Sequence, residues 1–171
     1  DKQEFIVDSL PSKDTYKERI KYNIAFRTGI SEGPVPHLGQ RQFYHIGLYA
    51  DKRIGRKSAL QLGTDVFFSR YLQDYIEFVS VAFPESHHSY ADPDTDYKRI
   101  GLFVGHELFI NKLSIEAQVG YYVYKPLDYE IDLYQRIGIK YYLYKNIFTG
   151  VGLKTHGGRA EAIEATIGVR L

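Results

Sequence analysis

The chain has 171 residues, a formal net charge of +1 and a mean hydropathy of −0.33. Its length predicts one domain over residues 1–171, and its near-neutral charge argues against a nucleic-acid surface. No apolar run is long enough for a membrane-spanning helix. The absence of Cys excludes a disulfide framework, a thiolate metal site and a catalytic thiol. Met is also absent, even at position 1, which suggests a processed and exported chain.

The first regular pattern follows a polar segment, residues 1–15, which we expect to be a loose lead-in. From residue 20 to residue 30, apolar side chains alternate with polar or small ones. Because successive side chains of a strand point to opposite faces, this segment has one apolar face and one polar face. Ile24 and Phe26 lie on the apolar face, and Arg27 lies on the polar face.

The same alternation recurs along the rest of the chain, interrupted by turn-forming Gly, Pro, Asn and Lys residues. The eight predicted strands cover about 17–30, 42–50, 58–69, 98–109, 113–124, 130–144, 147–156 and 161–171.

The longest connection, residues 70–97, has a mixed character. Its first part has apolar residues at helical spacing, but residues 78–83 could equally extend a hairpin, and the pattern does not decide between them. Its second part is loop by composition. Histidines, aspartates and hydroxyl groups in that part are weak candidates for a cation, sugar or partner site: Ser86, His87, His88, Ser89, Tyr90, Asp92, Asp94 and Asp96. The acidic run lacks the Gly and the distal Glu of a calcium loop.

Too few helices are predicted to cover the apolar faces of eight strands. A closed barrel satisfies every strand if its apolar face lies in lipid and its polar face lies inside. We therefore predict an all-β fold, an eight-stranded antiparallel transmembrane β-barrel in the bacterial outer membrane. The long connections after the first and third strands, and the short ones after the second, fourth and sixth, match such barrels. The alternative is a soluble lipocalin-like barrel with its apolar face turned inward around a ligand.

The polar face carries many charges, interleaved with glycines. An eight-stranded barrel is just wide enough inside for side chains, so opposite charges there should pair. We expect a plugged, non-conducting lumen in which Glu116 and Glu164 pair with Arg or Lys from neighbouring strands. The charged residues of the polar face are Arg19, Lys21, Arg27, Asp65, Glu107, Glu116, Arg136, Lys140, Lys154, Glu164 and Arg170.

The last hairpin, within residues 151–171, carries a family resemblance. A strand that ends in His156 leads into a turn at Gly157 and Gly158, and the closing strand contains Glu164. This arrangement resembles the PagL-type lipid A 3-O-deacylases, also labelled acyloxyacyl hydrolases. Those proteins are eight-stranded outer-membrane barrels with a Ser-His-Glu arrangement. The resemblance implies that His156 is the catalytic base and that Glu164 orients it.

The chain departs from the family pattern at the nucleophile. Position 158, where the family's His-x-Ser motif has its Ser, is Gly158, and the hydroxyl nearest in sequence lies on the other side of His156. Alternation also places His156 and Glu164 on the polar face, whereas a lipid-cleaving site must reach acyl chains. In a purely structural role, His156 would bond to Glu164, and Glu164 would pair with Lys154 or Arg170.

Two functions therefore stay open. The resemblance implies hydrolysis of an acyl ester of lipid A, with outer-membrane lipid or lipopolysaccharide as partner and with no cofactor and no metal. The missing Ser leaves a non-catalytic role as a structural or accessory barrel beside other outer-membrane proteins. Under the first hypothesis, any hydrolysis requires His156.

Overall fold

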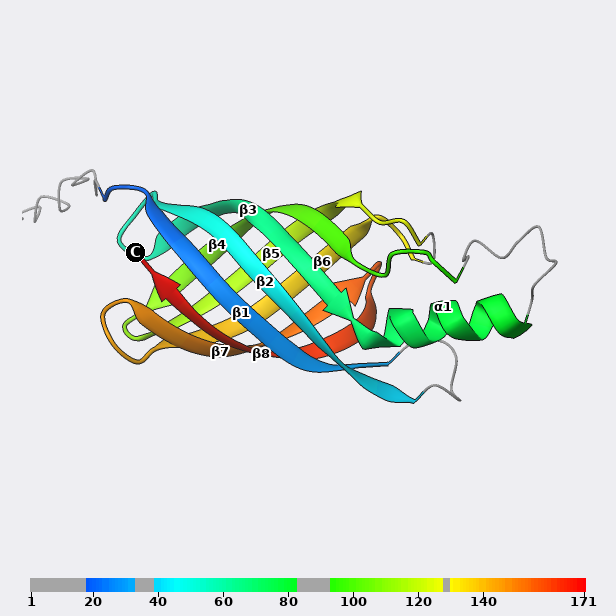
Figure 1. The fold of residues 1–171 in the computed structure, drawn as a ribbon. Helices are drawn as coiled ribbons and strands as arrows, with labels where there is room; N and C mark the ends of the chain where they lie inside the picture. The colour runs from blue at the N-terminus through cyan, green and yellow to red at the C-terminus, as the bar shows by residue number, and fades with distance from the viewer. Residues whose placement is uncertain (1–17, 33–38, 83–92, 128–129) are drawn as a thin grey trace, which may run out of the picture.

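The computed structural model describes residues 18–32, 39–82, 93–127 and 130–171 (Figure 1). The polar lead-in and most of the loop candidates, from Ser86 to Asp92, lie outside the described residues. The described strands are β1 (Lys21–Glu32), β2 (Gln40–Arg53), β3 (Ser58–Ser69), β4 (Arg99–Ile110), β5 (Leu113–Tyr124), β6 (Leu133–Tyr142), β7 (Ile147–His156) and β8 (Arg159–Arg170). The described helix is α1 (Arg70–Ala82), between β3 and β4.

The strands form a closed antiparallel barrel in sequence order, which confirms the predicted fold. Each strand pairs with the next, and β1 closes the sheet by pairing with β8, with Ile24 opposite Val169. Closure removes the free strand edges that an open sheet would expose. The connections β1–β2, β3–β4, β5–β6 and β7–β8 lie at one end of the barrel, here called the loop end. The terminal end, where Tyr22 and Leu171 exchange two backbone hydrogen bonds, lies opposite (Figure 1).

The side chains alternate as predicted, with apolar residues outside and polar residues inside. Six outward positions spread over six strands are between 47% and 64% exposed: Ile24, Leu62, Val119, Ile139, Val151 and Ile167. In contrast, Arg27, Asp65 and Glu164 are at most 1% exposed. The lipocalin-like alternative is therefore wrong, because its apolar face would have to line the interior.

The helix α1 settles the undecided part of the long connection. Its residues Tyr71, Leu72 and Ile76 are buried and form a small apolar cluster with Leu127 from the β5–β6 connection. Burial of this face stabilises the helix where a hairpin was equally compatible with the pattern. The helix continues beyond β3 at the loop end, as Figure 1 shows.

Aromatic rings fill one part of the lumen, and glycines make room for them. The buried rings of this cluster belong to Tyr49, Phe67, Phe103, Tyr122, Tyr134 and Phe148. A Cβ atom on Gly120 would lie 2.1 Å from the ring of Tyr134, so a larger residue there would displace the ring. Small residues on the polar face are thus required by packing.

Buried ion pairs fill the middle of the lumen. Arg136 donates to Glu164 over 2.7 Å and to Asp65 over 3.0 Å, and Lys140 lies 2.5 Å from Glu116. These side chains are at most 3% exposed. The prediction that Glu116 and Glu164 pair with basic residues is confirmed, although Arg136 reaches Glu164 from two strands away because the lumen is narrow. We call these five residues the central network.

Candidate functional site

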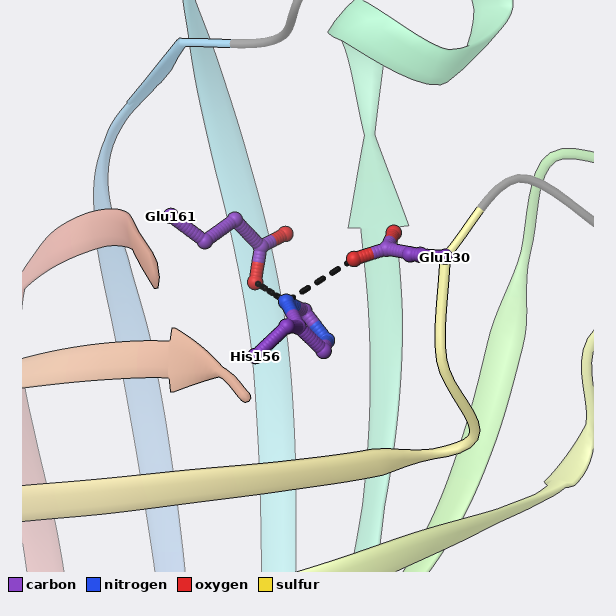
Figure 2. Close-up of side chains that lie close together, drawn as sticks. All are labelled: Glu130, His156 and Glu161. Atoms are coloured by element: carbon purple, nitrogen blue, oxygen red, sulfur yellow. Dashed lines mark ion pairs between the residues drawn. The ribbon is translucent and has the colours of Figure 1, made fainter. Parts of the chain in front are cut away.

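A second group of polar side chains lies at the loop end, around His156. We call it the loop-end cluster; its members are Arg99, Tyr122, Glu130, Lys154, His156 and Glu161. They come from five different parts of the barrel, from β4 through β8. Figure 2 shows the central part of the cluster, in which Glu130 and Glu161 approach His156 from two sides.

The imidazole of His156 is held at both ring nitrogens. Its Nδ1 lies 2.8 Å from a carboxylate oxygen of Glu130 and 3.2 Å from one of Glu161 (Figure 2). Its Nε2 lies 3.0 Å from the hydroxyl of Tyr122. Carboxylates beside Nδ1 favour the tautomer in which Nδ1 carries the proton and Nε2 is the acceptor. A carboxylate-oriented imidazole of this kind can act as a general base through Nε2.

A β-bulge brings Glu161 into the cluster. Lys154 pairs with Ala162, but the next residue of β7, Thr155, pairs with Ala160, so Glu161 is an extra residue in β8. Such a bulge bends the strand locally and can re-aim a side chain. Simple alternation puts Glu161 on the outer face, and the bulge explains why it points toward His156 instead.

Two cations balance the two carboxylates. Arg99 donates to both Glu130 and Glu161, at 3.1 Å in the second case, and the ammonium of Lys154 lies 2.5 Å from Glu161. Glu130 lies in the connection before β6. Burial raises the pKa of its carboxyl, but the charge of Arg99 and the contact with His156 outweigh burial and hold this pKa below its usual value.

The cluster has the donor atoms of a cation site. One atom each from Glu130, His156 and Glu161 lie within 4.8 Å of one another. However, Arg99 and Lys154 already neutralise these carboxylates, and a divalent cation beside them would meet two positive charges. The arrangement therefore fits an oriented histidine better than a metal centre.

The two residues singled out from the sequence lie in different places. The partners that the structure gives Glu164 are Arg136 and His45, whose Nδ1 is 3.5 Å away, so Glu164 belongs with the central network. The structure brings Glu130 and Glu161 to His156 instead, so Glu164 does not orient this imidazole.

The prediction that Glu164 pairs with Lys154 or Arg170 is also wrong. Lys154 pairs with Glu161 at the loop end, and Arg170 pairs with Asp51 over 2.7 Å at the terminal end. Lys154 stands opposite Arg136 in the β6–β7 register, but its ammonium lies against Glu161, whereas Arg136 reaches Glu164.

The turn after His156 contains Gly158, at the position where the family motif has its nucleophilic Ser. Gly157 and Gly158 have φ angles of +54° and +83°, in the left-handed region that favours glycine. A Cβ atom on Gly158 would meet nothing within 4 Å, so a larger side chain has space there but adopts a strained backbone.

The fold and its apolar outer surface define an outer-membrane β-barrel. The model of the family described as "Acyloxyacyl hydrolase, C-terminal domain" matches residues 20–171. The chain therefore belongs to the acyloxyacyl hydrolase family, as the last hairpin indicated, and lies in the bacterial outer membrane.

Several solved structures are similar to this chain at low sequence identity. A de novo designed transmembrane β-barrel is 10% identical with a TM-score of 0.51, over 92% of this chain and 99% of the designed one. Neisserial surface protein A is 12% identical with a TM-score of 0.49, over 89% of this chain and 96% of that one. Ail of Yersinia pestis is 7% identical with a TM-score of 0.45, over 89% and 97%.

A search of curated proteins gives no match to this chain. Among the described residues, no helix has the length and apolar character needed to cross a membrane.

Proposed function

We propose that the protein hydrolyses an acyl ester of lipid A, with His156 as general base at the loop end of the barrel. One observation carries the proposal. In a chain of the acyloxyacyl hydrolase family, the histidine of the family motif is held by carboxylates at Nδ1 and presents Nε2 to a hydroxyl.

The reaction would use water in place of the missing serine. His156 would take a proton from a water molecule that replaces the Tyr122 hydroxyl beside Nε2, and that water would attack the ester carbonyl. The bond between the carbonyl carbon and the sugar oxygen would then break as that oxygen takes the proton from His156, so that a fatty acid and the deacylated lipid leave. Glu130 and Glu161 would stabilise the imidazolium that forms. Arg99, beside both carboxylates, keeps them ionised for this role.

The position of the cluster supports this substrate class. In bacterial outer-membrane barrels the longer loops face the cell exterior, so the loop end would meet the outer leaflet, where lipid A lies. The exposed Arg159, at the start of β8 opposite His156, could bind phosphate groups of that lipid.

A non-catalytic accessory role is the second candidate, and two observations favour it. Gly158 provides no nucleophile, and both nitrogens of His156 already have protein partners. Under this hypothesis the loop-end cluster closes the lumen, and the chain contributes its outer surface to other membrane proteins.

Purified protein mixed with lipopolysaccharide separates the two candidates. We expect the wild type to release fatty acid slowly, His156→Ala to release none above background, and Gly158→Ser to release more because a hydroxyl is restored. Mass spectrometry of the lipid A would identify the lost acyl chain. Hydrolysis that survives His156→Ala would exclude the proposed base, and no hydrolysis by the wild type would favour the accessory role.

A further inference from the structure

A second histidine lies next to a serine on the outer face of the barrel. The Oγ atom of Ser58, at the start of β3, is 2.5 Å from Nε2 of His106 on β4. His106 is exposed on the outer surface, as the alternation of β4 requires, so both groups face lipid. A hydroxyl within hydrogen-bonding distance of an imidazole is the basic arrangement of an activated nucleophile.

An apolar groove, lined in part by His106, lies beside this pair. It has a volume of about 500 Å³ and crosses the outer face from β3 to β7. One row of laterally paired residues follows it, namely Leu60, His106, Ala117, Ile137 and Leu153. Five adjacent strands span about 19 Å at a strand spacing of about 4.8 Å, a length suited to an extended fatty acyl chain.

The shape of the groove results from a small residue along its path. Ala117, an outward residue of β5, leaves a depression between larger neighbours such as Val104 and Ile137. Because this face lies in the membrane, the occupant available to the groove is a hydrocarbon chain. A lipid whose chain lies in the groove would place its ester near one end, where Ser58 and His106 meet.

We propose that Ser58 and His106 form a second acyl-ester hydrolase site, whose substrate is a membrane glycerophospholipid. This site is independent of His156 and of the function proposed above. The pair lies toward the terminal end of the barrel, since Ser58 follows the short β2–β3 turn. Short turns of such barrels face the periplasm, and the leaflet on that side consists of glycerophospholipids.

The reaction proceeds in two balanced steps. His106 Nε2 takes the proton of Ser58, Oγ attacks the ester carbonyl, and the bond to the glycerol oxygen breaks as that oxygen receives the proton. A lysophospholipid leaves and the acyl chain stays on Ser58. Water, deprotonated by His106, then attacks the acyl-enzyme, and a fatty acid leaves as the proton returns to Oγ. Because the described residues give His106 no carboxylate partner, we expect slow turnover, since the acid of a triad contributes about 10⁴-fold.

A covalent probe tests a slow nucleophile best. The protein is reconstituted in vesicles of phosphatidylethanolamine and phosphatidylglycerol and treated with a hexadecyl fluorophosphonate, and the labelled residue is identified by mass spectrometry. We expect the label on Ser58, none in Ser58→Ala, and labelling at least about 100-fold slower in His106→Gln. Thr64→Ala, which removes another hydroxyl from β3, should label as fast as the wild type.

Two further comparisons test the groove and the lipid. Ala117→Phe should slow labelling by the hexadecyl probe but not by a methyl analogue, whereas Ala165→Phe, also on the outer face but away from the groove, should change neither. Wild type and His156→Ala should both form lysophospholipid in these vesicles, and Ser58→Ala should not. An unlabelled Ser58, labelling independent of His106, or cleavage confined to lipopolysaccharide would overturn the proposal.

Discussion

The central network and the loop-end cluster are built from the same kinds of side chain but differ in burial and in how the backbone places them. In the middle of the lumen, Glu164 and Arg136 are at most 1% exposed and are placed by regular alternation. At the loop end, Glu130 and Glu161 are 14% and 18% exposed and are placed by a loop and a bulge. The comparison shows that regular strands fix a stable interior, whereas the irregular positions bring charged groups to a histidine that solvent can reach.

Removal of Arg136 from the central network should have the largest effect on stability. Arg136→Met leaves Asp65 and Glu164 buried without their main cation, and loss of one partner of a buried pair costs about 3–5 kcal/mol. Urea unfolding in lipid vesicles, followed by tyrosine fluorescence, measures this difference. A loss below about 1 kcal/mol would show that water reaches the middle of the lumen.

A charge on the outer face should cost slightly less. Ile139→Arg, at an outward position of β6 that is 52% exposed, should lower the free energy of unfolding by about 2–4 kcal/mol near the membrane midplane. The same unfolding assay applies, with Ile139→Ala as the control for lost side-chain volume. An equal effect of both substitutions would contradict the burial of this surface in lipid.

The loop-end cluster should contribute less to folding and more to activity. Glu130→Gln keeps the shape of the side chain but removes the charge beside His156 and Arg99, and we expect a cost of about 1–2 kcal/mol. Release of fatty acid from lipopolysaccharide should fall at least about tenfold, because the imidazolium loses a carboxylate. Full activity together with a large loss of stability would assign Glu130 a structural role only.

Lowering the pH should cause a small loss in the free energy of unfolding, because it removes the ion pairs of Glu130. Because the folded state holds the pKa of Glu130 below its unfolded value, its contribution to stability is present above an unfolded pKa of about 4.3. That contribution is lost as the pH falls through the lower, folded pKa. The difference in unfolding free energy between wild type and Glu130→Gln should therefore shrink as the pH falls below about 4.3 and through the lower, folded pKa. A difference that is constant over this range would show that Glu130 has the same pKa in both states.

The sequence predicted the barrel well because alternation is a local property. Residues such as Ile24 and Arg27 are assigned to opposite faces by their spacing alone, and Arg99 and Tyr122 could have been placed inside by the same rule. The undecided segment became helix α1 through contact with Leu127, which is distant in sequence.

The partners of His156 could not be predicted in the same way. Glu130 was assigned to a strand but precedes β6, and Glu161 reaches the interior through a bulge that no spacing rule indicates. Glu164 was predicted on the correct, inward face of β8. In the pairing of β7 with β8, however, it lies opposite Gly152 and not opposite His156. Register across the barrel therefore decided which acid meets the histidine.

Two lumen histidines allow the most direct test of whether the loop-end cluster is the reactive part of the interior. His45 accepts hydrogen bonds from Arg27 and Arg136 in the middle of the lumen, and His156 lies in the loop-end cluster. Fatty acid released from lipopolysaccharide is measured per folded barrel for wild type, His45→Gln and His156→Gln. We predict that His45→Gln keeps the wild-type rate although it unfolds more easily, and that His156→Gln loses it. Equal rates for wild type and His156→Gln would contradict a catalytic role of the loop-end cluster.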